Sequence, residues 1–421
     1  MLKVLTMRKT ELFDFLFKTV ILLAVYDGIR HNSIFYSFSF VKEVVTLILF
    51  LAVLNYNDFK IVNPFKNFAV TSFTFYILTV GTFLTIGYLN LVPNPKLSPI
   101  GMHVKTIEFF VIAYLFNFYE QMTNKTYESL ISFFVNVYVV YILFNIASYF
   151  IHFPFITEFR PYNGRISSGY PTSDSQSMLF AFILLVFTVN SLKRYKIKFL
   201  ILSLGIVIQA TTTGVATYVF LTSILIVFGN YLVGKTGTRK NIISWLYILA
   251  TVTFILLFLI AYIDKQTLDA FYVMITSKSE FIIYYLKLKF FGVESEIGNQ
   301  LVTGTYIVRG NAVKEAMSAY NSFFELLTGK GVALAILVEN QFSFIIRAYG
   351  YLGLCFYILF IIGILVKSRK NGTKLFWHMS IIVSILLLTN VSQITTYLYQ
   401  IAVSFALAMN YCLSRTKTIE N

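Results

Sequence analysis

The sequence predicts an all-α polytopic membrane protein with about twelve transmembrane helices. Hydrophobic residues make up 57% of the 421 positions and charged residues only 13%, about half the charged share of a typical soluble domain. Apolar runs of roughly 20 residues recur along the chain, the length at which a helix crosses a hydrocarbon core of about 30 Å. The run 242–263 is apolar on every face, which favours helices because barrel strands alternate apolar and polar residues.

The chain therefore reads as one integral membrane domain, residues 1–421. The predicted spans are 12–29, 37–57, 68–92, 101–119, 129–153, 176–192, 197–211, 213–233, 242–263, 341–366, 374–391 and 395–413. Basic clusters follow even-numbered spans, at 193–198 (KRYKIK), 235–240 (KTGTRK), 367–374 (KSRKNGTK) and in the C-terminal tail. Cytoplasmic connections carry an excess of Lys and Arg, so both termini are predicted to be cytoplasmic.

Several function classes are excluded by what the sequence contains. The net charge of +15 lies mostly in short connections, where it sets topology, so nucleic acid is not an expected partner. Cys355 and Cys412 lie far apart in apolar runs and predict neither a disulfide framework nor a metal site. No DxD, GxxxxGK[ST] or HExxH motif occurs. We expect no metal and no cofactor.

Two connections on the outer side are too long to be turns, namely residues 154–175 and 264–340. Long connections tend to carry function. In the larger one, apolar residues recur every three to four positions over 305–327, which predicts an amphipathic helix, and Gly329 follows as a C-cap. Residues 281–291 (FIIYYLKLKFF) are apolar enough to lie in the membrane interface.

Positive charge on the outer side opposes the topological trend. The residues concerned are Arg160, Arg165, Arg309, Arg347, Lys105 and Lys42. Arg347 lies inside span ten, where an arginine at the helix centre costs about 2.5–3.5 kcal/mol. Guanidinium groups bind phosphate oxygens in bidentate fashion, so the cluster suits an anionic headgroup such as a lipid-linked pyrophosphate. Solvated or snorkelling arginines remain the alternative.

Acidic residues are few on that side. Glu339 and Asn340 open span ten, and Asn340 lies seven residues before Arg347, on the same helical face. Glu339 is a candidate general base toward a sugar hydroxyl, or alternatively a paired structural acid. Asp27, at the outer end of span one, is a second candidate.

Four stretches, in order, resemble the Wzy-type O-antigen and capsule polymerases, which share a superfamily with the O-antigen ligases. They are 165–169 (RISSG) with Pro171, 209–214 (QATTTG), Arg309 followed by 329–331 (GKG), and 339–354 with Gly350 and Gly353. With the twelve spans and the large loop, the resemblance covers most of the chain. Threonines 211–213 replace the Ser-Arg common in the family, and Glu339 stands where the ligase branch has histidine, which favours a polymerase.

The resemblance implies a metal-independent glycosyltransferase at the periplasmic face of a bacterial inner membrane. It would polymerise undecaprenyl-diphosphate-linked oligosaccharide units, with a chain-length regulator protein as a further candidate partner. Arg165 and Arg309 match family arginines and would hold diphosphate, whereas Arg160, Arg347, Asn340 and Lys105 rest on the physical argument. The expected catalytic residues are Glu339 and Arg309. A ligase acting on lipid A-core, or a flippase for the same lipid-linked oligosaccharide, stays open.

Overall fold

The protein is described by a computed structural model. It describes residues 9–30, 33–38, 40–58, 67–91, 98–151, 153–156, 171–188, 197–198, 201–202, 204–205, 320, 322–331, 341–388 and 399–414. Within these residues the regular secondary structure is entirely helical, and the β pairing amounts to one isolated antiparallel bridge between Ser33 and Ile156. The helical fold class is confirmed for this part of the chain.

The first four helices coincide with the first four predicted spans. They are α1 (Lys9–Arg30), α2 (Val41–Tyr56), α3 (Phe68–Leu91) and α4 (Ser98–Phe116). A short unpredicted helix, α5 (Tyr119–Thr123), follows, and then comes α6 (Tyr127–Phe150). The Glu120 carboxylate accepts a 2.8 Å hydrogen bond from the Tyr127 N–H, which satisfies an otherwise unpaired donor at the start of α6.

Helix α7 (Pro171–Thr188) begins five residues before the predicted span. It therefore starts within the predicted outer connection 154–175, whose extent stays a prediction. The physical reason is Pro171, because proline suits the first position of a helix, where its missing N–H has no partner to lose.

The C-terminal part contains α14 (Phe323–Thr328), α16 (Gln341–Asn371), α17 (Thr373–Leu388) and α18 (Tyr399–Ser414). The predicted helix 305–327 is wrong at its end, because Ser322 is extended and its side chain caps a new helix by accepting from the Glu325 N–H. Serine favours such N-cap positions over helix interiors. The predicted C-cap Gly329 is confirmed, with φ +84°.

Three of the described helices are long and apolar enough to cross a membrane: Phe68–Leu91, Tyr127–Ser148 and Phe344–Asn371. They indicate an integral membrane protein. Spans predicted at 213–233 and 242–263, residues 264–319 of the large loop and most of 197–211 lie outside the described residues, so the count of twelve stays a prediction.

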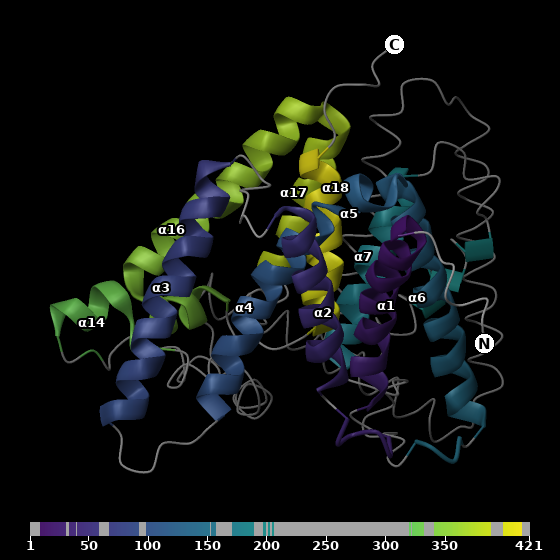
Figure 1. Cartoon of the computed structure of the whole chain (residues 1–421), viewed down its shortest axis with the longest axis horizontal. Coiled ribbons are helices and arrows are strands. Elements are labelled where there is room, and N and C mark those ends of the chain that lie inside the picture. The colour runs from purple at the N-terminus through teal and green to yellow at the C-terminus, as the bar shows by residue number, and fades with distance from the viewer. Residues whose placement is uncertain are drawn as a thin grey trace, which may run out of the picture.

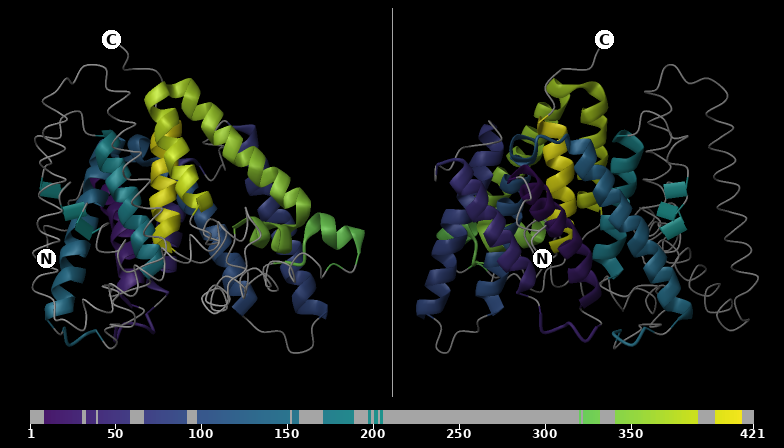
Figure 2. Two further views of the ribbon diagram at one scale, coloured as in Figure 1. Left: turned by 180° about the vertical axis from the view of Figure 1, so that it is seen from behind. Right: turned by 45° about the vertical axis from the view of Figure 1, so that its right-hand side comes forward.

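Helices α1, α2, α17 and α18 run side by side in nearly one direction, α3, α4 and α16 are inclined to them, and α14 lies across (Figure 1). The connection between α1 and α2 lies at one end, and α5 lies at the opposite end with the turn between α16 and α17 (Figures 1 and 2). Helix α16 packs along α3, and α18 packs against α4, α7 and α1. Aromatic rings fill the centre: Phe73 contacts Phe110 and Phe360, and Phe109 stacks on Phe405 with centroids 5.8 Å apart.

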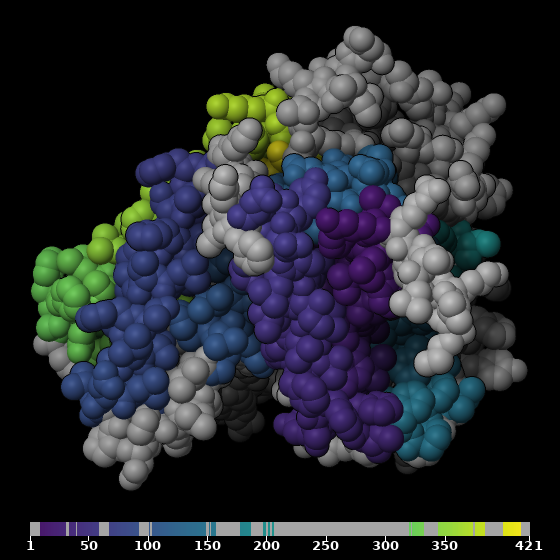
Figure 3. Space-filling view, viewed as in Figure 1, coloured from purple at the N-terminus to yellow at the C-terminus, as the bar shows by residue number. Residues whose placement is uncertain are grey.

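Apolar side chains also cover the outside of the bundle. On α2 they include Val44, Leu47 and Leu51, and on α3 Phe75 and Phe83, all between 46% and 69% exposed. Figure 3 shows both helices on the surface of the molecule. Charged residues such as Asp14, Asp27 and Lys42 are buried instead. This inversion fits a protein whose surroundings are hydrocarbon.

Candidate functional site: a broken helix and a buried ionic cluster

Helix α16 is broken at Gly350, which has φ +70° and ψ −174°. This backbone region is open essentially to glycine alone. The break divides α16 into residues 341–349 and 351–371. The candidate membrane span Phe344–Asn371 includes this break, six residues from its start.

A helix end leaves four carbonyl groups without intrahelical partners, and these must be satisfied in a membrane. All four at the end of the first part of α16 accept hydrogen bonds from other segments: Ile346 from the Tyr320 hydroxyl (3.1 Å), Arg347 from the Lys330 N–H (2.9 Å), Ala348 from the Gly331 N–H (3.0 Å), and Tyr349 from the Tyr76 hydroxyl (2.7 Å). The end of the large loop is thus bonded directly onto the break.

Two glycines make this contact possible. A Cβ atom at Gly329 would overlap the backbone of Ala348 and Tyr349, and one at Gly350 would overlap the backbone of Leu327. The chain segments therefore approach more closely than any other residue would permit. These glycines belong to the third and fourth stretches that carry the family resemblance, so those two stretches are in direct contact.

Arg347 lies in the last turn before the break and is partly exposed. A cation is favourable there because carbonyl groups give the end of a helix partial negative charge. Burial raises the pKa of the neighbouring Tyr320 hydroxyl, and the positive charge of Arg347 opposes that rise. Lys330 adds a second cation, paired with Glu325 at 3.3 Å. The predicted site residue Arg347 is thus beside the end of the large loop.

A second polar region lies where α1, α2 and α4 meet. Asp27 Oδ1 accepts hydrogen bonds from Arg30 Nε and Lys42 Nζ, each at 2.9 Å. All three residues are buried. Lys42 Nζ also lies 5.1 Å from the centre of the Tyr399 ring, a cation–π contact. Because Asp27 is held by two cations, it is poorly placed to serve as a general base.

Lys105 and Glu108 of α4 face this same region. Lys105 interacts electrostatically with Lys42 and Asp27, and Glu108 interacts with Lys42 and Glu43. The sequence placed Lys42 and Lys105 in the predicted outer-side cluster of cations and gave Asp27 as a second candidate base. The sequence analysis missed Arg30, Glu43 and Glu108. The spacing of three residues in the pairs Asp27–Arg30 and Lys105–Glu108 could have indicated Arg30 and Glu108.

Arg347 and Lys105 face different regions of the described structure, and the predicted cluster of cations as a whole stays a prediction. On α4, Thr106 hydrogen-bonds with Tyr349 of the broken helix, and His103 and Tyr349 both lie beside Gly81 of α3. Lys105 and Glu108 lie on the opposite face of α4, because each residue advances a helix by about 100°. The predicted site residues Arg160, Arg165, Arg309, Glu339 and Asn340 lie outside the described residues.

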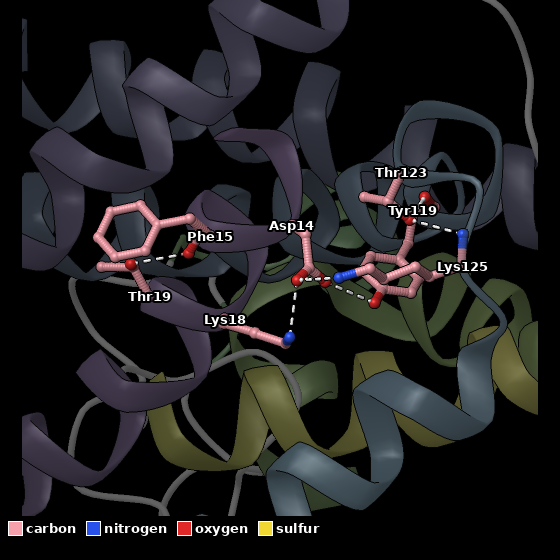
Figure 4. A network of polar contacts seen from close by, with 7 residues as sticks. All are labelled: Asp14, Phe15, Lys18, Thr19, Tyr119, Thr123 and Lys125. Carbon is pink, nitrogen blue, oxygen red and sulfur yellow. Dashed lines mark hydrogen bonds and ion pairs between the residues drawn. The ribbon is translucent and has the colours of Figure 1, made fainter. Parts of the chain in front are cut away.

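A third polar group surrounds Asp14 near the start of α1 (Figure 4). Its Oδ2 accepts from Lys18 Nζ at 2.6 Å and Lys125 Nζ at 2.8 Å, and its Oδ1 accepts from the Tyr119 hydroxyl at 2.8 Å. Tyr119 lies in α5 and Lys125 in the connection to α6. This group therefore fastens α1 to that connection.

No protein-family model matches this sequence, and no curated protein matches it significantly. Among the described residues, no group of three or more His, Cys, Asp or Glu side chains could hold a metal ion.

Proposed function

We propose that this protein is a membrane glycosyltransferase that polymerises oligosaccharide units carried on a polyprenyl diphosphate. The observation that supports it is the contact of the large loop with the break in α16. There the 329–331 stretch bonds to Arg347 and Ala348, so two stretches of the family resemblance are in contact beside Arg347. The proposed reaction is the one that the family resemblance implies, and the cations near the break could bind a diphosphate.

In the proposed reaction, an acceptor sugar hydroxyl attacks the anomeric carbon of the donor sugar. The bond from that carbon to the diphosphate oxygen breaks, and its electron pair leaves with the polyprenyl diphosphate. Arg309, Arg165 and Arg347 neutralise charge on this leaving group, and Glu339 takes the hydroxyl proton. Glu339 and Asn340 directly precede Gln341, the first residue of α16, six residues before Arg347.

The test is incubation of the purified protein with lipid-linked repeat units, without nucleotide, followed by gel separation of the glycans. A ladder at repeat-unit spacing supports a polymerase. Arg309→Ala should abolish the ladder, whereas Arg369→Ala, at the opposite end of α16, should leave it intact. Wild-type chain lengths in Arg309→Ala would overturn the role of that residue.

A flippase for the same lipid is the second candidate, and one observation favours it. Buried charges occur near both ends of α1, at Asp14 and Asp27, whereas a polymerase needs charge at only one face. Movement of a fluorescent lipid-linked oligosaccharide across a vesicle bilayer, without a ladder, would support this function. Transfer to lipid A-core without a ladder would support a ligase.

A further inference from the structure

Two adjacent phenylalanines of α14 are exposed at the end of the large loop. Phe323 is 74% exposed and Phe324 is 64% exposed, among the largest exposures of apolar side chains in the described residues. In the space-filling view α14 lies at the surface beside α3 (Figure 3). Two phenyl rings in water would forgo the free energy that burial of apolar surface provides. The surroundings of α14 therefore need to be identified.

Hydrogen bonds fix the position of α14 along the bundle. Lys330 and Gly331, which follow α14, donate their N–H groups to the carbonyls of Arg347 and Ala348 at 2.9 and 3.0 Å. Both acceptors belong to the candidate membrane span Phe344–Asn371. Ala348 lies four residues after the start of that span, about 6 Å at 1.5 Å per residue. Helix α14 is therefore attached within a candidate membrane span and not beyond its end.

A second candidate span gives a similar position. A Cβ atom at Gly331 would lie 3.3 Å from Leu84 Cβ, and Leu84 lies seven residues, about 11 Å, before the end of the candidate span Phe68–Leu91. Asn67, just before α3, donates to the carbonyl of Gly363, late in α16. Helices α3 and α16 thus run antiparallel, so the end of α3 and the start of α16 lie at the same end of the bundle.

Exposed apolar side chains also occur on the neighbouring helices at this position. On α3, Phe83 and Ile86 lie on either side of Leu84 in the sequence and are 69% and 51% exposed. On α16, Tyr351 and Leu352 follow the break and are 38% and 40% exposed. Exposed apolar surface of this extent is typical of contact with a membrane or a protein partner. Its place within two candidate membrane spans favours the membrane.

The polar groups of α14 have partners close by, as a position near hydrocarbon requires. The Ser322 hydroxyl accepts from the Glu325 N–H at 3.1 Å. The Thr328 hydroxyl donates to the Phe324 carbonyl at 2.9 Å, and the Glu325 carboxylate pairs with Lys330 at 3.3 Å. The helix also lies across the bundle (Figure 1). Helices in the membrane interface have this orientation, with their apolar face about 5–10 Å into the boundary between headgroups and acyl chains.

We propose that α14 is an interfacial helix and that Phe323 and Phe324 insert between membrane lipids. The partner is the boundary between the headgroups and the acyl chains of a phospholipid bilayer. The end of the large loop is then held at the membrane by lipid as well as by its hydrogen bonds to α16. This inference goes beyond the proposed function, because the contact would serve a polymerase, a ligase and a flippase alike.

Tryptophan fluorescence of the whole protein in lipid nanodiscs tests the proposal. Trp245→Phe and Trp377→Phe first remove the two native tryptophans, and Phe323→Trp or Phe324→Trp then supplies a single reporter. The nanodiscs contain phosphatidylcholine with or without bromine atoms near the headgroup end of its acyl chains. Brominated lipid quenches tryptophan within the bilayer, whereas iodide quenches tryptophan in water.

The matched control is Phe75→Trp in the same background. Phe75 is 67% exposed and lies within the candidate span Phe68–Leu91. We expect brominated lipid to reduce the fluorescence of Phe323→Trp by a fraction comparable with that for Phe75→Trp. Iodide should quench both several-fold less than free N-acetyltryptophanamide in buffer. Phe324→Trp should give the same result, and it serves as the reporter if Phe323→Trp does not fold.

The other possible surroundings of α14 give different results. Quenching of either reporter by brominated lipid supports the proposal. Quenching of both reporters by iodide alone would overturn it and place α14 in water. Protection of both reporters from both quenchers would also overturn it, because the rings would then be covered by protein. The polymer-ladder assay is independent, so its failure would leave the lipid contact standing.

Discussion

Two buried ionic clusters, near opposite ends of α1, differ in how fully their oxygens are bonded. Asp14 and Asp27 are 13 residues apart, about 20 Å along the helix. Both oxygens of Asp14 accept hydrogen bonds from charged or hydroxyl donors. The Asp27 cluster instead borders Glu43 and Glu108, which each keep one oxygen without a donor. A closed cluster fastens helices together, whereas an open one retains the capacity to bind a ligand.

The largest effect is expected for Asp27→Ala. This change leaves Arg30 and Lys42, which are 5% and 1% exposed, without their shared carboxylate. Breaking a buried ion pair on one side costs about 3–5 kcal/mol, so the protein should lose most of its folded yield and unfold far more easily in denaturant. Removing a second charge, in Asp27→Ala/Lys42→Met, should recover part of the stability. A single variant as stable as wild type would contradict the tight pairing.

A smaller loss is expected for Asp14→Ala. Three hydrogen bonds are removed here instead of two, but the side chains of Lys18 and Lys125 are 26% and 43% exposed and reach solvent once released. The expected destabilisation is about 2–3 kcal/mol, measured as a lower denaturant midpoint of the purified protein. Lys125→Gln should cost less than about 1 kcal/mol because that lysine is exposed. If Asp14→Ala matched or exceeded Asp27→Ala, burial would not be what separates the clusters.

The break in α16 is closed by hydrogen bonds to its backbone carbonyl groups. Tyr76→Phe removes the hydroxyl that donates to the Tyr349 carbonyl at 2.7 Å and leaves that buried carbonyl unsatisfied. We expect a loss of about 1–2 kcal/mol in unfolding free energy. Tyr36→Phe, at an exposed tyrosine in the connection between α1 and α2, is the control and should have little effect. No change in Tyr76→Phe would argue that the break does not need this donor.

The smallest effect on stability is expected for Glu108→Gln. The variant keeps the shape of the side chain and removes no hydrogen bond from Glu108 Oε1, which accepts none. Its unfolding midpoint should lie within about 0.5 kcal/mol of wild type in free energy. A loss comparable to that of Asp14→Ala would show that Glu108 belongs to a closed structural cluster after all.

The helices of the described part could be predicted because apolar runs have the length that a membrane requires. Their ends depend on local chemistry that hydropathy does not detect, as the early start of α7 at Pro171 and the cap at Ser322 illustrate. The break at Gly350 was not predicted, because glycine also occurs in unbroken membrane helices. Its position is decided by the loop segment that packs against it.

The candidate site was predicted in part. Charges inside apolar runs are conspicuous, so Arg347, Lys105, Lys42 and Asp27 were identified individually. Which of them share a site depends on the neighbours of each helix face, and one sequence does not give these. The sequence therefore did not predict that α4 separates two polar regions, one beside Tyr349 and the other around Lys105.

The ion pair between Lys42 and Asp27 also constrains how the protein is made. Lys42 belongs to the second predicted span, which would enter the bilayer after the first, and an unpaired lysine in a membrane helix costs about 2.5–3.5 kcal/mol on insertion. Its counterion stands 15 residues earlier in the chain and is therefore synthesised first. Partition of α1 and α2 from the translocon as a preassembled hairpin would avoid exposing either charge to lipid, which makes the order of synthesis part of the folding pathway.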